Sequence, residues 1–123
     1  MKEYISSFLN KIFAISKLVT RNWEDEVLIM QAKNLMSSNH WKSSIKESGR
    51  LEEKEFKVYS QWGDDGIIQF LIKTLDIKNK YFIEFGVADF YESNSHFLLV
   101  NNNWKGLVID GSEKNINRLK NSS

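Results

Sequence analysis

The pattern of apolar and polar positions divides the chain into a helical first part and an alternating second part. Between residues 3 and 19, apolar side chains recur at spacings of three and four, which predicts an amphipathic helix. A second helix is predicted after Asn22, because asparagine is a common N-cap and the acidic residues that follow suit the positive end of a helix dipole. Four residues are expected on its apolar side: Val27, Met30, Leu35 and Met36.

The stretch from residue 37 to residue 57 is polar and charged. We interpret it as a linker or a loosely packed connection, because clusters of small polar and charged residues separate periodic segments. It sets the predicted boundary between a helical extension over residues 1–57 and a second unit over residues 58–123.

The second unit alternates between helical and extended patterns. A wide apolar face, preceded by Asp64 or Asp65 as the cap, predicts a helix over residues 64–77. Residues 80–85 are mostly apolar and aromatic, which predicts a strand that is buried on both faces. Three further elements are predicted: a short helix over 93–103, a strand over 105–110 and a helix from 112. This order implies an α/β fold with parallel strands, in which ligands bind at the carboxyl ends of the strands.

Composition narrows the classes of function. The 17 basic and 16 acidic residues give a net charge of +1, without the basic excess that nucleic-acid binding needs. The chain has no cysteine and only two histidines, so we expect no metal site and assign the protein to a reducing cytoplasm. Lysines interrupt the most apolar N-terminal stretch, so we also expect no transmembrane segment.

Each predicted strand ends in a carboxylate that a glycine follows closely. Glu84 precedes Gly86 after the first strand, and Asp110 precedes Gly111 after the second. A carboxylate at the tip of the second strand can accept hydrogen bonds from a ribose diol, as in dinucleotide-binding folds. The glycine after the first strand allows a ligand to approach the backbone closely. The pattern therefore predicts a nucleoside site at this end of the sheet.

The sequence of the loop after the first strand helps to distinguish a dinucleotide with a pyrophosphate from a nucleoside with a cationic group. A pyrophosphate needs a glycine-rich loop at a helix N-terminus, whereas this sequence has GVADF with Glu92 close by. The acidic groups would repel a pyrophosphate, and they suit a cationic amino group. S-adenosylmethionine carries an ammonium group, a sulfonium and a ribose diol, so it fits better than a nicotinamide dinucleotide.

Three segments in this order resemble the FkbM-type family of S-adenosylmethionine-dependent methyltransferases: YSQWGDDGIIQFLI, FIEFGVADFYESNS and WKGLVIDGS. The resemblance covers about residues 59–120. It implies a class I methyltransferase fold with S-adenosylmethionine as the methyl donor. It also implies methyl transfer to a hydroxyl oxygen of a small-molecule or glycan acceptor. A class I sheet has more strands than the two found here, so we expect a partial, incomplete Rossmann-like sheet, the first half of such a domain.

The resemblance also implies roles for individual residues. Glu84 would orient the methionine ammonium, and Gly86 and Val87 would form the floor beneath the methionine portion. Asp110 would hold the ribose hydroxyls. The remaining candidates lie near the adenine (Gly111 and Ser112), in the loop (Asn94) or close to the site (Gln61, Asp65 and Asp89).

Two further expectations concern the loop and the catalyst. Phe90 stands where the family usually has glycine, which implies about 1–2 kcal/mol of strain if this residue has a positive φ. The family's general base usually comes from a later part of the domain, so no catalytic residue is assigned here.

A non-catalytic interpretation remains open beside the methyltransferase one. The chain would then be a remnant or an interaction module, which self-associates through its N-terminal helices or through an exposed sheet edge. In that case Glu84 and Asp110 are ordinary polar residues at strand ends, and Asp64 and Asp65 are helix caps.

Overall fold

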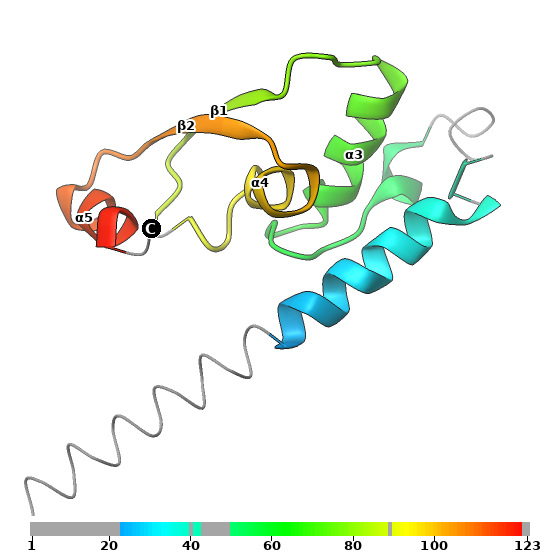
Figure 1. Ribbon diagram of the computed structural model, residues 1–123, viewed down its shortest axis with the longest axis horizontal. Coiled ribbons are helices and arrows are strands. Elements are labelled where there is room, and N and C mark those ends of the chain that lie inside the picture. The colour runs from blue at the N-terminus through cyan, green and yellow to red at the C-terminus, as the bar shows by residue number, and fades with distance from the viewer. Residues whose placement is uncertain (1–22, 40, 43–49, 89, 122–123) are drawn as a thin grey trace, which may run out of the picture.

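The computed structural model describes residues 23–39, 41–42, 50–88 and 90–121. A helix over residues 23–37 comes first, and the helix predicted over residues 3–19 lies outside the described residues. The elements that follow are η1 (Leu51–Lys54), α3 (Asp64–Thr74), β1 (Tyr81–Phe85), α4 (His96–Asn102), β2 (Lys105–Ile109) and α5 (Glu113–Asn121) (Figure 1). Within these ranges no helix is both long and apolar enough to cross a bilayer.

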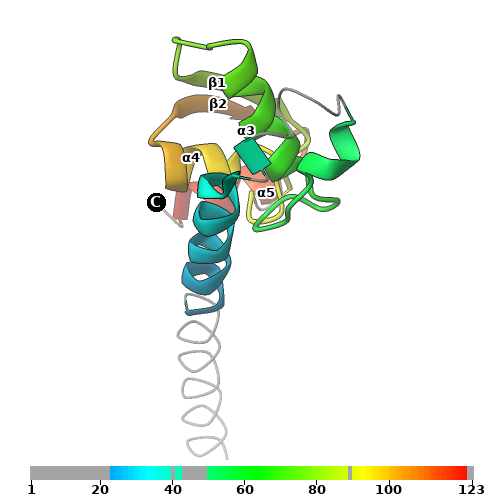
Figure 2. The same ribbon diagram turned by 90° about the vertical axis from the view of Figure 1, so that its right-hand side faces the viewer.

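The two strands form a parallel sheet, as the alternating pattern predicted. Ile83 lies opposite Leu107 in the register of β1 and β2. The connection between the strands passes through α4, which lies on one side of the sheet in both views (Figures 1 and 2). Gly106 is needed at its position in β2, because a Cβ there would stand 2.3 Å from the ring of Phe82. The α/β class is therefore confirmed.

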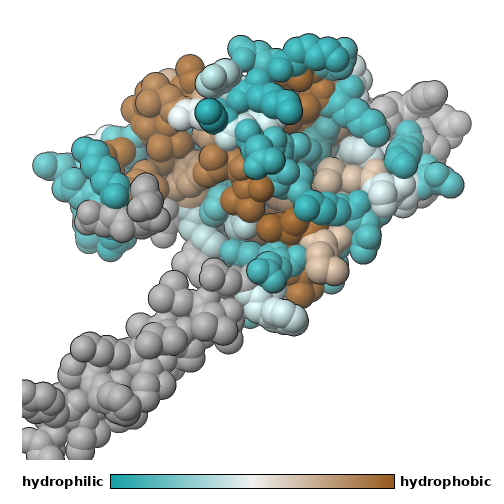
Figure 3. Space-filling view, viewed as in Figure 1, coloured by the Kyte–Doolittle hydropathy of each residue, from teal (hydrophilic) through white to brown (hydrophobic). Residues whose placement is uncertain are grey.

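The expectation that the first strand is buried on both faces is wrong. Tyr81, Ile83 and Phe85 are 65%, 66% and 71% exposed, while the residues between them are half-buried. Leu107 and Ile109 are exposed beside them on β2, and apolar side chains gather over this part of the surface (Figure 3). The reason is that α4 covers only the opposite face of the sheet, so the apolar residues of this face lack a covering layer among the described residues.

The helix over residues 23–37 packs against the α/β part, on the far side of α4 from the sheet (Figures 1 and 2). Ala32 is buried in the same core as Val58, Tyr59 and Phe97. Its neighbours at helical spacing, Ile29 and Met36, are partly buried against that core. The predicted apolar side was therefore wrong in part: Val27, Met30 and Leu35 are exposed. The small side chain of Ala32 lets the helix approach the core closely, so the side of the helix that carries Ala32 faces the core.

The second half of the predicted linker is packed against α3. Residues Leu51–Lys54 form η1, and Lys54 is buried with its ammonium 5.6 Å from the centre of the Phe70 ring. Gly66 on α3 lies so close to this segment that a Cβ would stand 1.9 Å from the carbonyl oxygen of Lys54. This close approach holds the chain around Lys54 against α3, the helix that contains the candidate residue Asp65.

Candidate functional site

The carboxyl ends of the two strands bring together the residues that the sequence placed at a nucleoside site. Glu84 lies near the end of β1, and Asp110 directly follows β2. The backbone N–H of Gly86 donates to the carbonyl of Ile109 at 2.8 Å, so the two strand ends are joined. Gly86 has a φ of 71°, and a Cβ added at Gly86 or at Gly111 would meet nothing within 4 Å. The backbone at this edge is thus open to a ligand.

Asp110 connects the loop after β1 to the start of α5. Its Oδ2 accepts a hydrogen bond from the backbone N–H of Ala88 at 2.9 Å. Its Oδ1 accepts one from the backbone N–H of Ser112 at 2.8 Å and one from Nδ2 of Asn115 at 3.0 Å. These bonds, led by that from Ser112, lower the pKa of Asp110 below its ordinary value of 3.8. A carboxylate has about four acceptor positions, so roughly one remains for a ligand hydroxyl.

Glu84 supports the N-terminus of α4. Its Oε1 accepts from the backbone N–H of Asn94 at 2.9 Å, and its Oε2 accepts from both the backbone N–H, at 2.9 Å, and the hydroxyl of Ser95. Asn94 and the N-cap Ser95 precede the first turn of α4, so Glu84 fixes the residues that lead into the helix. The cap expected at Ser93 or Asn94 is instead at Ser95, which makes no side-chain cap bond of its own. Asn94 thus contributes to the loop through its backbone N–H, which donates to Glu84. That Glu84 orients the methionine ammonium stays a prediction.

Asp65 anchors the turn that precedes α3. Its Oδ2 accepts from the backbone N–H groups of Val58, Tyr59 and Ser60 at 2.8, 2.7 and 2.9 Å, and its own N–H donates to Oγ of Ser60 at 2.9 Å. The N-cap of α3 is Gly63, so Asp65 is not a cap in the expected sense. Its side chain is only 1% exposed, which leaves no accessible surface for a ligand. The structure therefore gives Asp65 a role in folding the chain.

The other residues expected near the site differ in placement. Gln61 is exposed, and its carbonyl oxygen accepts a hydrogen bond from Nζ of Lys57 at 3.2 Å. Val87 is buried at the start of the loop, and its role beneath the methionine portion stays a prediction. Asp89 lies outside the described residues.

Phe90 has a φ of 65°, so the positive φ that its position implied is present. Ala88 shares this left-handed conformation, with a φ of 49°. The Phe90 ring lies in a stack, 5.1 Å from the ring of His96 and 6.5 Å from that of Phe82. Stacking of this kind stabilises the loop and offsets part of the backbone strain.

An aromatic cluster of Tyr59, Phe90, Tyr91 and His96 was missed by sequence reasoning. The His96 ring stacks on Tyr59 at 3.8 Å, and Nδ1 of His96 lies 2.9 Å from the carbonyl oxygen of Tyr91. Because a carbonyl can only accept, Nδ1 carries the proton of this bond. Burial, followed by the nearby charge of Asp25, raises the pKa of Tyr59 to about 12. The cluster joins segments far apart in sequence, so no local pattern announces it.

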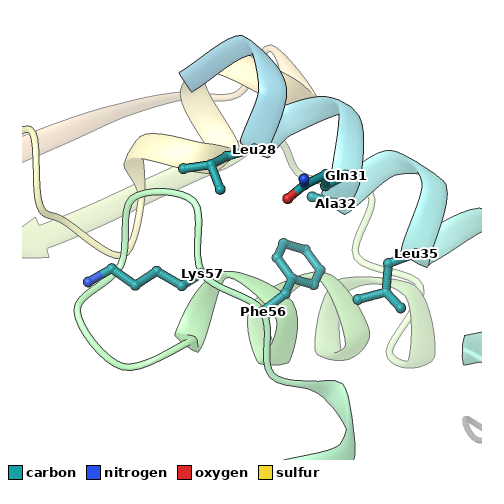
Figure 4. A pocket seen from close by; sticks show the side chains of 6 residues that line it. All are labelled: Leu28, Gln31, Ala32, Leu35, Phe56 and Lys57. Carbon is teal, nitrogen blue, oxygen red and sulfur yellow. The ribbon is translucent and has the colours of Figure 1, made fainter. Parts of the chain in front are cut away.

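A separate apolar pocket of about 170 Å³ lies between the helix over residues 23–37 and the chain before α3 (Figure 4). Its lining consists of Leu28, Gln31, Ala32, Leu35, Phe56 and Lys57. None of the expected site residues lines it, and sites for small molecules usually measure about 300 Å³ or more. In the described part of the chain, no group of three or more acidic or histidine side chains is placed to hold a metal ion.

Comparisons of the chain with protein-family models, with curated proteins and with solved structures found no match.

Proposed function

We propose that the chain binds S-adenosylmethionine at the carboxyl ends of β1 and β2 and that it is an FkbM-like methyltransferase. The observation that carries this proposal is the bond from Ala88 to Asp110, which brings the two strand ends together beside two open glycines. Ligands of open α/β sheets bind at this edge. The acceptor position left on Asp110 suits a ribose hydroxyl, and the uncovered backbone at Gly86 and Gly111 suits the close approach of a nucleoside.

The charge at this edge supports a cationic ligand over a pyrophosphate. Glu84 and Asp110 lie at neighbouring strand ends, whereas Glu92 of the loop after β1 is paired with Lys57, with 3.7 Å between Oε1 and Nζ. The negative charges of Glu84 and Asp110 would attract the ammonium and sulfonium groups of S-adenosylmethionine, and they would repel phosphate groups. Transfer of the methyl group to a hydroxyl oxygen would then depend mainly on holding donor and acceptor in line.

Titration calorimetry on the full chain tests this proposal. We expect S-adenosylmethionine to bind, and we expect Asp110→Asn to weaken binding by about tenfold or more, because an amide has fewer acceptor positions than a carboxylate. Asp76→Asn is the matched control, since Asp76 is an exposed carboxylate that pairs with Lys78 after α3. Binding of a nicotinamide dinucleotide in place of S-adenosylmethionine would contradict the assignment.

The uncovered apolar face of the sheet favours a second candidate function, a non-catalytic interaction module. Large contiguous apolar patches on a protein surface often mark sites of association. A folded sample that takes up no S-adenosylmethionine at millimolar concentration, yet self-associates in sedimentation experiments, would favour this candidate over the methyltransferase.

A further inference from the structure

The helix over residues 23–37 contacts the loop between β1 and α4 through one long-range hydrogen bond. The hydroxyl of Tyr91 donates to Oδ1 of Asp25 at 2.7 Å, across 66 positions of sequence. Bonds to a charged acceptor are stronger than those between neutral groups. The ring of Tyr91 is also held edge-on by the rings of Tyr59 and His96, each at 5.8 Å. Tyr91 is therefore fixed both at its ring and at its hydroxyl.

Three carboxylates from three parts of the fold hold this β1–α4 loop (residues 86–88 and 90–95). Asp110 accepts from Ala88 near its start, Asp25 accepts from Tyr91 near its middle, and Glu84 accepts from the backbone at its end. Two of the three lie at the carboxyl ends of the strands: Glu84 near the end of β1, and Asp110 directly after β2. Asp25 comes from the helix over residues 23–37, which the sequence assigned to an accessory extension.

The loop needs such anchors because part of its backbone is unfavourable. Ala88 and Phe90 both have positive φ values, a conformation that residues with a Cβ rarely adopt unless their surroundings impose it. A loop with this backbone would relax to other conformations if its contacts were removed. The same backbone presents Gly86 and Ala88 at the open edge of the sheet.

We propose that Asp25 is a positioning residue of the candidate site: through Tyr91 it holds the β1–α4 loop in the conformation that receives the ligand. The identity of that ligand as S-adenosylmethionine rests on the proposed function. The holding of the loop itself rests only on the contacts just described. The helix over residues 23–37 thereby contributes to the candidate site through Asp25.

Hydrogen exchange of the loop amides in the full chain tests the holding role without a ligand. We expect exchange at Ala88, Phe90 and Asn94 to become about tenfold faster in Asp25→Ala and in Tyr91→Phe. The double variant should exchange no faster than either single one, because both remove the same bond. Asp25→Asn keeps an acceptor oxygen and should restore slow exchange, and Glu24→Ala, a charge removal at the exposed neighbouring position, should have no effect.

Calorimetry with S-adenosylmethionine on the same variants tests the positioning role. Affinity should fall about three- to tenfold in Asp25→Ala and Tyr91→Phe and stay near that of the unmodified chain in Asp25→Asn. Exchange rates equal to those of Glu24→Ala would overturn the holding role, and faster exchange with unchanged affinity would overturn the positioning role. If the unmodified chain fails to bind S-adenosylmethionine, the proposed function is wrong, and the exchange comparison still decides whether Asp25 holds the loop.

Discussion

Asp110, which directly follows β2, accepts a hydrogen bond from the backbone N–H of Ala88 in the loop after β1, with 2.9 Å between the two atoms. Together with the bond from the Gly86 N–H to the Ile109 carbonyl, it joins the carboxyl ends of the two strands. Each of its two partners lies close in sequence to a glycine with open space beside it: Ala88 follows Gly86 by two positions, and Asp110 directly precedes Gly111. Asp110 is therefore part of the fold, and under the proposed function it would also meet the ligand.

Stability should depend on the protonation of Asp110 at acid pH. Its hydrogen bonds hold its pKa below 3.8 in the folded chain, so the unfolded chain binds this proton more readily. The stability that Asp110 contributes is fully present above its ordinary pKa and is lost as the pH falls through the lowered value. Urea midpoints measured below about pH 5 should fall less steeply in Asp110→Asn than in the unmodified chain. Parallel curves for the two proteins would contradict the bonding described for Asp110.

Gly111→Ala separates ligand binding from folding. The added methyl meets no protein atom within 4 Å, and Gly111 lacks the positive φ of Gly86. We therefore expect its free energy of unfolding to stay equal or to rise by up to about 1 kcal/mol, while affinity for S-adenosylmethionine falls.

The matched comparison is Gly86→Ala, which has equal space but a φ of 71° and should lose about 1 kcal/mol of stability. An alanine at position 111 that leaves affinity unchanged would place the ligand elsewhere.

Substitution of Asp65 should expose its structural role. Asp65→Ala removes the acceptor of three backbone N–H groups and should lower the free energy of unfolding by on the order of 3 kcal/mol or more. Asp65→Asn should cost less, because its amide oxygen can accept the same three bonds at the Oδ2 position. Its NH2 group would stand at the Oδ1 position, which has no hydrogen-bond partner among the described residues, so part of the loss should remain. Equal losses in the two variants, measured by urea denaturation, would argue against this bonding.

Tyr59 should make the fold sensitive to alkaline pH. Burial raises its pKa from 10.0 to about 12 in the folded chain. Because the folded value is the higher one, the stability that Tyr59 contributes is present below pH 10.0 and is lost as the pH rises through about 12. Tyr59→Phe keeps the ring in the aromatic cluster and removes the titrating hydroxyl. Its urea midpoint should thus fall less between these pH values, and an unchanged slope would show that another group controls alkaline unfolding.

The succession of helices and strands could be predicted because it depends on local periodicity. The apolar run over residues 80–85 and the apolar face of α3 each specify one type of element whatever packs against them. The parallel pairing of β1 and β2 followed from the helix between them. For the same reason, Asp110 and Gly86 could be placed at one edge of the sheet from sequence alone.

Burial and hydrogen-bond partners could not be predicted in this way, because they depend on residues distant in sequence. Ile83 is exposed because α4 covers only one face of the sheet, and a strand pattern does not record how many layers cover it. Glu84 serves the N-terminus of α4, although its place at a strand end suggested a ligand contact. Likewise, no pattern links Asp25 to Tyr91. The local sequence thus predicts where the strands end. Tertiary packing determines how many hydrogen-bond acceptor positions of the carboxylates at those ends are already occupied within the chain.

The open edge formed by Gly86, Ala88, Asp110 and Gly111 is where we propose that S-adenosylmethionine binds. Amide chemical shifts of the full, isotopically labelled chain, recorded during titration with this ligand, test the claim directly. We expect the largest shifts at the amides of Gly86, Ala88 and Gly111, with small shifts at Ala32 and Phe56, which line the separate apolar pocket. Shifts confined to that pocket, or no shifts at millimolar ligand, would contradict the claim.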